Sequence, residues 1–297
     1  MTSPSGSSSA PAPSPLPARP RLIATDLDGT LLHDDKSVSE RTVAALEAAE
    51  EAGIEVFFVT GRPARWMDVV SAHVHGHGMA ICANGAVVVD LHSGGRLLKA
   101  RPLERETALE VVAALRAAAP GTTFAVEDTD GINYEPEYPG FPQDPGGIVA
   151  TAEKLLRAGS GAGAGAAADG ASPAPVLKLL AHHPELTPDG FLRLAREVAG
   201  DHATITRSSP TALLEISGLG VSKASTLALC CAERSISADE VVAFGDMPND
   251  LEMLTWAGTS YAMGNAHPDV LAAASGRTLT NNEDGVAIVI EQILARR

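Results

Sequence analysis

Short apolar runs alternate with amphipathic stretches in the first hundred residues of the chain. The apolar runs have the length of buried strands, and they occupy residues 22–25, 54–59 and 79–83. Apolar residues recur at helical spacing over residues 40–52, where Ser39 is placed to cap a helix and Gly53 to end it. A second helix is predicted from residue 64 to about 73, and a hairpin over residues 86–100. Strands that alternate with helices in this way predict an α/β fold with a doubly wound, Rossmann-like parallel sheet.

A different arrangement of elements begins near Pro102. Helices are predicted over residues 104–118, 150–158 and 188–199, and strands over residues 122–127, 176–181 and 203–206. This set predicts an inserted α+β cap domain, residues 101–211, with a small sheet of its own. Residues 158–171 are Ala or Gly except for Ser160 and Asp169, so we expect a flexible surface loop there.

The first arrangement returns at residue 212. Strands are predicted over residues 212–216, 240–244, 261–263 and 278–280, and helices over residues 223–233, 251–257, 268–274 and 285–294. Ser222 is placed to cap the first of these helices. The predicted core domain therefore consists of residues 21–100 and 212–297, interrupted by the cap.

Length and charge restrict the partners of this chain. Its 297 residues suit about two domains, and a net charge of −15 argues against a partner held through nucleic-acid phosphates. The three cysteines have no zinc spacing and no even-numbered disulfide framework, which favours a reducing cytoplasm. No apolar run approaches the roughly 18 residues of a membrane span. Residues 1–20 are rich in Ser, Pro and Ala and lack an apolar signal region, so we expect a disordered tail.

Two carboxylates follow the first strand, because Asp26 and Asp28 stand one residue apart before Gly29. In open α/β sheets, ligands bind in the crevice at the carboxyl ends of the strands. Two carboxylates so close repel each other, and a divalent cation such as Mg²⁺ would relieve the repulsion. The alternative is an ordinary Asx turn or a calcium-type loop, since Asp and Gly are common turn residues.

Other strand ends carry polar residues of complementary types. These are Thr60 and Gly61, Asn84 and Gly85, and Asp246, Asn249 and Asp250, while Lys223 stands at the start of a helix. If the strands are parallel, these loops converge at one edge of the sheet. Carboxylates for a cation, together with Lys, Thr, Asn and backbone donors for an anion, are what phosphoryl transfer requires. Lys223 alone would be an ordinary solvated lysine, but in this setting the positive end of its helix adds to its charge.

Four motifs stand in a fixed order along the chain. They read Asp26-Leu27-Asp28-Gly29-Thr30, Thr60-Gly61-Arg62, Lys223, and Gly245-Asp246-Met247-Pro248-Asn249-Asp250. In these motifs the chain resembles the haloacid dehalogenase (HAD) superfamily of phosphatases and, within it, the Cof-type sugar-phosphatase group. The match covers roughly residues 21–100 and 212–297. The insert resembles the type-2 α/β caps of this group mainly by its position between the second and third motifs.

The resemblance implies a division of labour among the acidic residues. Asp26 would be the nucleophile that forms an aspartyl-phosphate. Asp28 would be the general acid that protonates the leaving alkoxide, and then the base that activates water. Mg²⁺ would be held by Asp26, by Asp246 and by the main-chain carbonyl of Asp28, with Asp250 supporting this shell.

The resemblance also implies the groups that bind the transferring phosphoryl. These are Thr60, the backbone amides of Gly61 and Leu27, Lys223 and Asn249. Arg62 would support the site or contact the substrate. Asn84 faces the active site in the Cof-type group, although a simple turn residue is an equal alternative.

Several further residues are weaker candidates. His73, His75 and His77 alternate like metal ligands but lie among glycines, which favours a solvated loop. In the cap, Asn133, Tyr134 and Glu135 could meet the substrate. Trp66 and Trp256 are expected to be packing residues.

The leading hypothesis is a Mg²⁺-dependent phosphomonoesterase that acts on a small phosphorylated metabolite, such as a sugar phosphate. A phosphotransferase or phosphomutase could use the same aspartyl-phosphate, and a non-enzymatic phospho-accepting regulatory module is a third hypothesis. The expected partner is a small phosphate ester, without nucleic acid or membrane, and the expected assembly is a monomer or a weak homodimer. In this superfamily the cap reads the leaving group, and the cap is where the resemblance is weakest.

Overall fold

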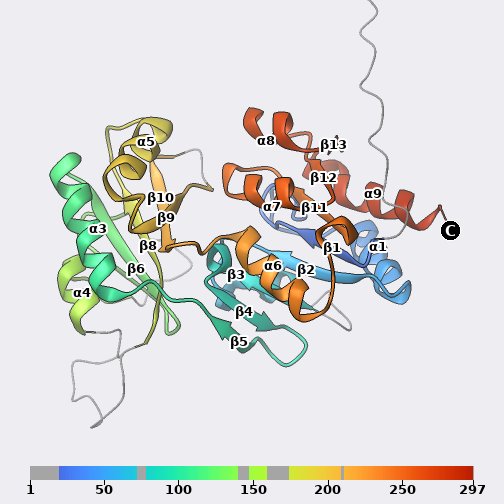
Figure 1. The fold of residues 1–297 in the computed structure, drawn as a ribbon, viewed down its shortest axis with the longest axis horizontal. Helices are drawn as coiled ribbons and strands as arrows, with labels where there is room; N and C mark the ends of the chain where they lie inside the picture. Colours follow the sequence, from blue (N-terminus) through green and yellow to red (C-terminus); the bar gives the residue numbers. More distant parts are fainter. Residues whose placement is uncertain (1–19, 72–77, 140–146, 159–173, 209–210, 297) are drawn as a thin grey trace, which may run out of the picture.

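A computed structural model describes residues 20–71, 78–139, 147–158, 174–208 and 211–296. The predicted N-terminal tail and the Gly/Ala-rich loop lie almost entirely outside these residues, as do His73, His75 and His77. Within the described ranges, helices and strands form two units, a large sheet with its helices and a smaller sheet with its own (Figure 1).

The large sheet has eight strands and forms the core domain. Its order is β13 (Gly276–Arg277), β12 (Thr259–Ala262), β11 (Val241–Gly245), β1 (Leu22–Thr25), β2 (Glu55–Val59), β3 (Met79–Cys82), β4 (Val87–Asp90) and β5 (Arg96–Ala100). The strands from β13 to β3 pair in parallel, and β4 and β5 extend the sheet as an antiparallel hairpin. The predicted doubly wound, Rossmann-like sheet is confirmed.

Strand β1 occupies the middle of this sheet. Ala24 lies opposite Phe57 of β2 on one side and opposite Ala243 of β11 on the other. Every residue of β1 is buried, which explains why its sequence is a continuous apolar run without alternation. The three strands run in the same direction, so the loops that follow them leave from the same edge.

Helices cover the core sheet, and two of them begin at the capping residues expected from the sequence. They are α1 (Glu40–Glu51), α2 (Asp68–Ser71), α6 (Lys223–Glu233), α7 (Leu251–Trp256), α8 (Pro268–Ala273) and α9 (Gly285–Leu294), with short 3-10 turns at Ala64–Trp66, Ala83–Gly85, Ala238–Glu240, Pro248–Asp250 and Asn281–Glu283. Ser39 accepts a hydrogen bond from the Thr42 amide at the start of α1, and Ser222 accepts one from the Ser225 amide at the start of α6. Both predicted caps are confirmed.

The smaller sheet has five antiparallel strands and forms the cap. Its order is β7 (Ile132–Tyr134), β6 (Thr123–Asp128), β8 (Val176–His182), β10 (Leu213–Gly218) and β9 (Ala203–Thr206). Its helices are α3 (Arg105–Ala118), α4 (Ala152–Ala158) and α5 (Pro188–Ala199), which lie on the side away from the core (Figure 1). Phe124, Leu179 and Phe191 are fully buried between this sheet and the helices. None of the described helices is both long and apolar enough to cross a membrane.

Strand β10 lies in the cap sheet, whereas the sequence placed its residues in the core. It pairs with β8 on one side and β9 on the other, with Leu214 opposite Ala181 and Ile216 opposite Ile205. A short apolar run fits either sheet equally well, and its partners are not visible in the sequence. The chain therefore returns to the core after Gly218. The predicted boundary at residue 212 lies before the last cap strand, so it comes too early in the chain.

Other differences concern element ends. The helix predicted over residues 64–73 begins as a 3-10 turn at Ala64–Trp66 and continues as α2. Strand β7 was not predicted, because it is short and follows directly after a turn at Gly131. The last two core strands begin two residues earlier than predicted, at Thr259 and Gly276.

Candidate active site

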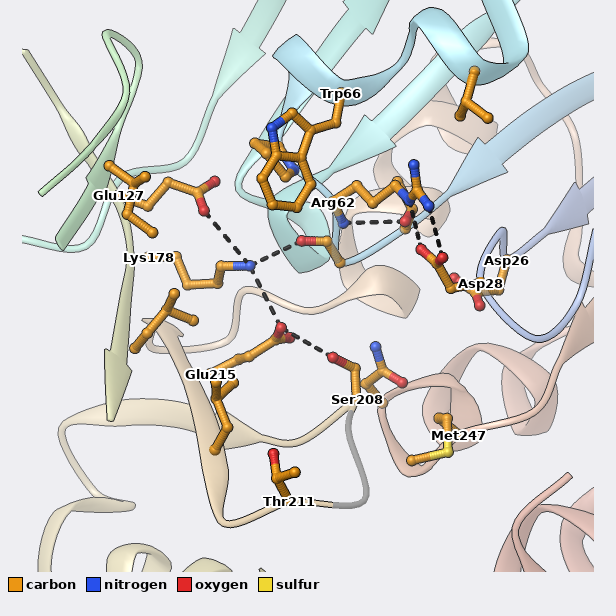
Figure 2. Close-up of a pocket in the computed structure, with 18 of the residues that line it drawn as sticks. Asp26, Asp28, Arg62, Trp66, Glu127, Lys178, Ser208, Thr211, Glu215 and Met247 are labelled. Carbon is orange, nitrogen blue, oxygen red and sulfur yellow. Dashed lines mark hydrogen bonds and ion pairs between the residues drawn. The ribbon is translucent and has the colours of Figure 1, made fainter. Parts of the chain in front are cut away.

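A cleft of about 810 Å³ lies between the edge of the core sheet and the cap. Asp26 follows β1, Thr60 follows β2 and Asp246 follows β11, so the parallel strands bring these residues to one edge. Thr60 lines the cleft. Asp26, Asp28 and Arg62 also line it (Figure 2). The predicted convergence of the polar loops is therefore present.

Lys223 is buried between two carboxylates. Its Nζ atom donates to Asp26 Oδ1 at 2.6 Å and to Asp250 Oδ1 at 2.7 Å, and the residue is 1% exposed. Burial disfavours the charged amine, but the charges of Asp250 and Asp26 hold the pKa of Lys223 above its usual range. The other carboxylate oxygen of Asp250 accepts from the backbone N–H groups of Asp246 and Met247 at 3.1 and 3.0 Å. Asp250 thus fixes both the lysine and the loop after β11.

Asp246 is held against the turn that follows β1. Thr30 Oγ1 donates to Asp246 Oδ1 at 3.2 Å. Gly29 adopts a positive φ of 77°, and a Cβ atom there would lie 2.3 Å from Asp246 Oδ2. Only glycine suits both the backbone conformation and the close approach of this carboxylate.

Three carboxylates form a compact acidic cluster. Among the described residues, Asp26, Asp246 and Asp250 each bring one oxygen to within 4.8 Å of the others. Burial raises the pKa of Asp26 to about 7, with Lys223 opposing the rise and Asp250 adding to it. Burial and then the charge of Asp26 raise the pKa of Asp246 to about 8. One lysine does not balance three acids, and a hard divalent cation with oxygen ligands fits this cluster.

Asp28 is not part of this cluster and forms ion pairs with two cations. Arg62 donates to it from Nε at 2.5 Å and from Nη2 at 2.7 Å, and Lys36 Nζ donates at 2.8 Å. Partial burial favours the neutral acid, but these hydrogen bonds and charges hold the pKa of Asp28 below its usual range. Its side chain is therefore an ionised carboxylate in this conformation. Whether its main-chain carbonyl binds a metal stays a prediction.

Three of the phosphoryl-binding candidates, Thr60, Gly61 and Asn249, line the same cleft. Thr60 is buried, and its Oγ1 accepts from the Arg62 backbone N–H at 3.1 Å. Asn249 Nδ2 donates to Asn84 Oδ1 at 3.0 Å, and Asn84 in turn donates to Glu215 of the cap. Asn84 is a buried turn residue with a positive φ of 54°, and its side chain joins Asn249 of the core to Glu215 of the cap. Leu27 is fully buried beneath the loop after β1. The phosphoryl contacts themselves stay predictions.

Comparison with known proteins fits this geometry. A sequence model of the haloacid dehalogenase-like hydrolase family matches residues 23–290. The chain belongs to this family. It is 30% identical to the 5-amino-6-(5-phospho-D-ribitylamino)uracil phosphatase YcsE of Bacillus subtilis over 91% of this chain and 94% of that protein. It is 29% identical to the pyridoxal phosphate phosphatase YbhA of Escherichia coli over 90% of this chain and 96% of that protein.

A solved haloacid dehalogenase-like hydrolase from B. subtilis has the same fold as this HAD-like hydrolase. The TM-score is 0.73 and the identity 27%, covering 91% of this chain and 99% of that chain. The resemblance predicted from the four motifs is confirmed, and so is the prediction of a HAD-type phosphatase, because the relatives are phosphatases. The hypothesis of a non-enzymatic regulatory module is therefore not carried further.

Sequence reasoning missed three cleft residues of this HAD-like hydrolase, which we call the cap triad: Glu127, Lys178 and Glu215. They lie on β6, β8 and β10 and are almost fully buried. Lys178 Nζ donates to the Gly61 carbonyl at 2.8 Å, which links the cap to the loop after β2 (Figure 2). Lys178 and Glu215 each interrupt an apolar run, and this signal could have identified them. Glu127 stands beside Asp128 at the end of β6 and carries no such signal.

Two weaker predictions also changed. Trp66 was expected to be a packing residue, but it lines the cleft (Figure 2). Glu135 was a candidate for substrate contact, but it is buried in the cap, where it pairs with Arg116 and accepts from the Phe124 and Ala152 amides. Glu135 therefore stabilises the cap.

Proposed function

We propose that this chain is a Mg²⁺-dependent phosphomonoesterase that hydrolyses a small phosphorylated metabolite through an aspartyl-phosphate on Asp26. The observation that carries the proposal is the cluster of Asp26, Asp246 and Asp250 around buried Lys223, at the carboxyl edge of a parallel sheet. A divalent cation would balance the excess negative charge of this cluster, and it would also hold a phosphate dianion beside Asp26.

The metal would be held by Asp26 and Asp246, with the main-chain carbonyl of Asp28, and it would neutralise charge shared by these carboxylates and the phosphate. Lys223 holds the Asp26 carboxylate in place and keeps a positive charge beside it. Thr60, Asn249 and the backbone amides of the neighbouring loops would donate to the equatorial phosphoryl oxygens.

In the first step, an Asp26 oxygen forms a bond to phosphorus while the bond from phosphorus to the ester oxygen breaks. A proton from Asp28 neutralises the departing alkoxide. In the second step, the Asp28 carboxylate takes a proton from water, the hydroxide attacks phosphorus, and the bond to Asp26 breaks. The products are an alcohol and inorganic phosphate, and Asp28 is again protonated.

Asp28 cannot act as an acid while Arg62 and Lys36 hold it ionised. A phosphate dianion in the cleft would attract the same two cations. We infer that the arriving substrate competes for Arg62 and Lys36, which releases Asp28 and lets its pKa rise towards the value of a general acid. Substrate binding would thereby allow Asp28 to act as the general acid.

The decisive experiment measures phosphate release from p-nitrophenyl phosphate and from a panel of phosphorylated metabolites, with Mg²⁺ and with EDTA. We expect release that depends on Mg²⁺ and that is abolished in Asp26→Asn. Near-normal turnover by Asp26→Asn would refute the nucleophile. Phosphate recovered on an added sugar acceptor in place of water would instead favour a phosphotransferase. The relatives named above act on two different esters, so the panel is kept broad.

A further inference from the structure

The cap triad forms one ionic cluster on the face of the cap sheet that borders the cleft. Glu127 of β6 lies directly opposite Lys178 of β8, and Glu215 of β10 lies opposite Leu180, two residues further along β8 and so on the same face of the sheet. The exposed fractions are 2% for Glu127, 3% for Lys178 and 6% for Glu215. The proposed steps of hydrolysis use none of these residues, yet all three line the cleft (Figure 2).

The ammonium group of Lys178 is already committed to protein oxygens. Its Nζ atom lies 2.8 Å from the Gly61 carbonyl, 3.5 Å from Glu215 Oε1 and 3.9 Å from Glu127 Oε2. The Gly61 contact is a close hydrogen bond, and the two carboxylates form ion pairs with the ammonium group. The positive charge of Lys178 is therefore already paired with two carboxylates of the protein.

The triad also carries more negative than positive charge, with two carboxylates and one ammonium group. Arg65 approaches Glu127 from the core at 4.0 Å, but its side chain is 29% exposed and it does not line the cleft. Solvent screens such a partly exposed pair, so Arg65 offsets the triad only in part. Glu215 also accepts from Ser208 Oγ at 3.0 Å and from Asn84, which fixes its carboxylate in position.

The triad lies next to the position expected for the phosphoryl group. Gly61 is one of the predicted phosphoryl-binding residues, and a Cβ atom on it would lie 3.4 Å from Glu215 Oε2. The alcohol part of an ester held at Asp26 would therefore extend towards the triad. The cleft is also lined by apolar side chains, Ile132, Leu180 and Leu213 of the cap and Trp66 of the core, and by the hydroxyl groups of Ser208 and Thr211.

We propose that Glu127 and Glu215 determine which phosphate ester is accepted: the alcohol is neutral or cationic, carries hydroxyl or amino donors, and has no second anionic group. This inference rests on the proposed phosphomonoesterase, because it needs the phosphoryl group at Asp26. Hydroxyl or amino donors on the alcohol would hydrogen-bond to the carboxylates of Glu127 and Glu215, which are largely shielded from water. A second anion would be desolvated against two carboxylates, and the cation that the described residues place between them, Lys178, is already paired with both.

Two matched pairs of substrates test the proposal. Glycerol phosphate and phosphoglycerate differ by a terminal hydroxymethyl or carboxylate group, and phosphoethanolamine and phosphoglycolate differ by an aminomethyl or carboxylate group. Released phosphate gives kcat/KM for each. We expect the neutral or cationic member to be preferred by about tenfold or more, since like charges in a desolvated site repel strongly.

The variants Glu127→Gln and Glu215→Gln remove one charge each at nearly constant shape. Each is expected to lower the preference within a pair by about threefold or more, because the repulsion of the anionic member is reduced. Glu185→Gln, in the exposed loop after β8 and away from the cleft, is the matched control and should leave the ratio unchanged. Circular dichroism and melting temperatures establish that the variants are folded, and the two independent variants guard against misfolding of one.

The outcomes separate this inference from the proposed function. Mg²⁺-dependent hydrolysis of p-nitrophenyl phosphate with equal or better use of the anionic esters would overturn the role of the triad and leave the phosphomonoesterase standing. An unchanged ratio in both folded Gln variants would overturn it as well. Absence of Mg²⁺-dependent hydrolysis of any ester would overturn both proposals.

Discussion

Replacing Lys223 with Met removes the cation from the acidic cluster while keeping a side chain of similar length. The Nζ atom touches Asp26 at 2.6 Å and Asp250 at 2.7 Å, and the residue is 1% exposed. Removing one partner of a buried ion pair typically costs about 3–5 kcal/mol, because the other charge stays buried. Two carboxylates lose their partner here, so we expect the free energy of unfolding to fall by at least about 3 kcal/mol at pH 8 without metal.

The pH dependence of this loss distinguishes charge from packing. Lys223 lowers the pKa of Asp26, so without it Asp26 keeps its proton to a higher pH in the folded state. At pH 5 Asp26 is protonated in both proteins and its unpaired charge disappears. Because one pKa unit corresponds to about 1.4 kcal/mol and pH 8 lies one unit above the pKa of Asp26, the loss should shrink by up to roughly that amount between pH 8 and pH 5.

Urea unfolding of both proteins in EDTA, followed by tryptophan fluorescence at pH 5 and pH 8, measures this difference. Lys154→Met on the exposed surface of α4 is the matched control and should change stability by less than about 0.5 kcal/mol. We also expect kcat of Lys223→Met to fall by about a hundredfold or more, since a preorganised charge at the nucleophile is lost. A loss of stability below about 1 kcal/mol, or an equal loss at both pH values, would refute the reasoning.

Three further predictions follow from the same site. Arg62→Ala should raise the pKa of Asp28, because the largest of its stabilising hydrogen bonds is lost, and Asp28 must be protonated to act as the general acid. The alkaline limb of a pH profile of kcat/KM should therefore move to higher pH, and an unmoved limb would exclude Asp28 as the titrating group. Gly29→Ala places a Cβ atom 2.3 Å from Asp246 Oδ2, so calorimetry should find Mg²⁺ binding weakened by about tenfold or more, and unchanged binding would contradict the assignment of Asp246. The metal-free protein should lose stability as pH rises from about 4 to 8, because the pKa of Asp26 is raised from 3.8 to about 7 and the folded state binds the additional proton. Mg²⁺ should raise the melting temperature more at pH 8 than at pH 6. A melting temperature of the metal-free protein that does not change with pH would contradict the raised pKa of Asp26.

The core of the site was predictable because the common direction of parallel strands fixes the edge of the sheet at which their following loops lie. Once Asp26, Thr60 and Asp246 are each placed directly after a buried strand, the common direction of the strands brings them to one edge. The prediction needed neither the strand order nor the register. The clamp on Asp28 was not predictable, since it depends on where Arg62 and Lys36 turn in the folded loops.

The cap was less predictable because its chemistry depends on long-range pairing. The apolar run at β10 was assigned to the core, since nothing in a short run states which sheet it joins. Glu127 and Glu215 come together around Lys178 only because β6 and β10 lie on either side of β8. The face that they share then meets the loop at Gly61. The charge of Glu215 within an apolar run is a local signal, but its partners come from tertiary structure.

The formation of a phosphoryl bond on Asp26 is the central claim, and trapping that bond tests it most directly. Rapid acid quenching of the protein during turnover of a radiolabelled phosphate ester, followed by peptide mapping, locates the label. We predict acid-stable, hydroxylamine-sensitive label on the peptide that contains Asp26, and no label in Asp26→Asn. Label on a different residue, or steady release of phosphate without any labelled protein, would contradict the account.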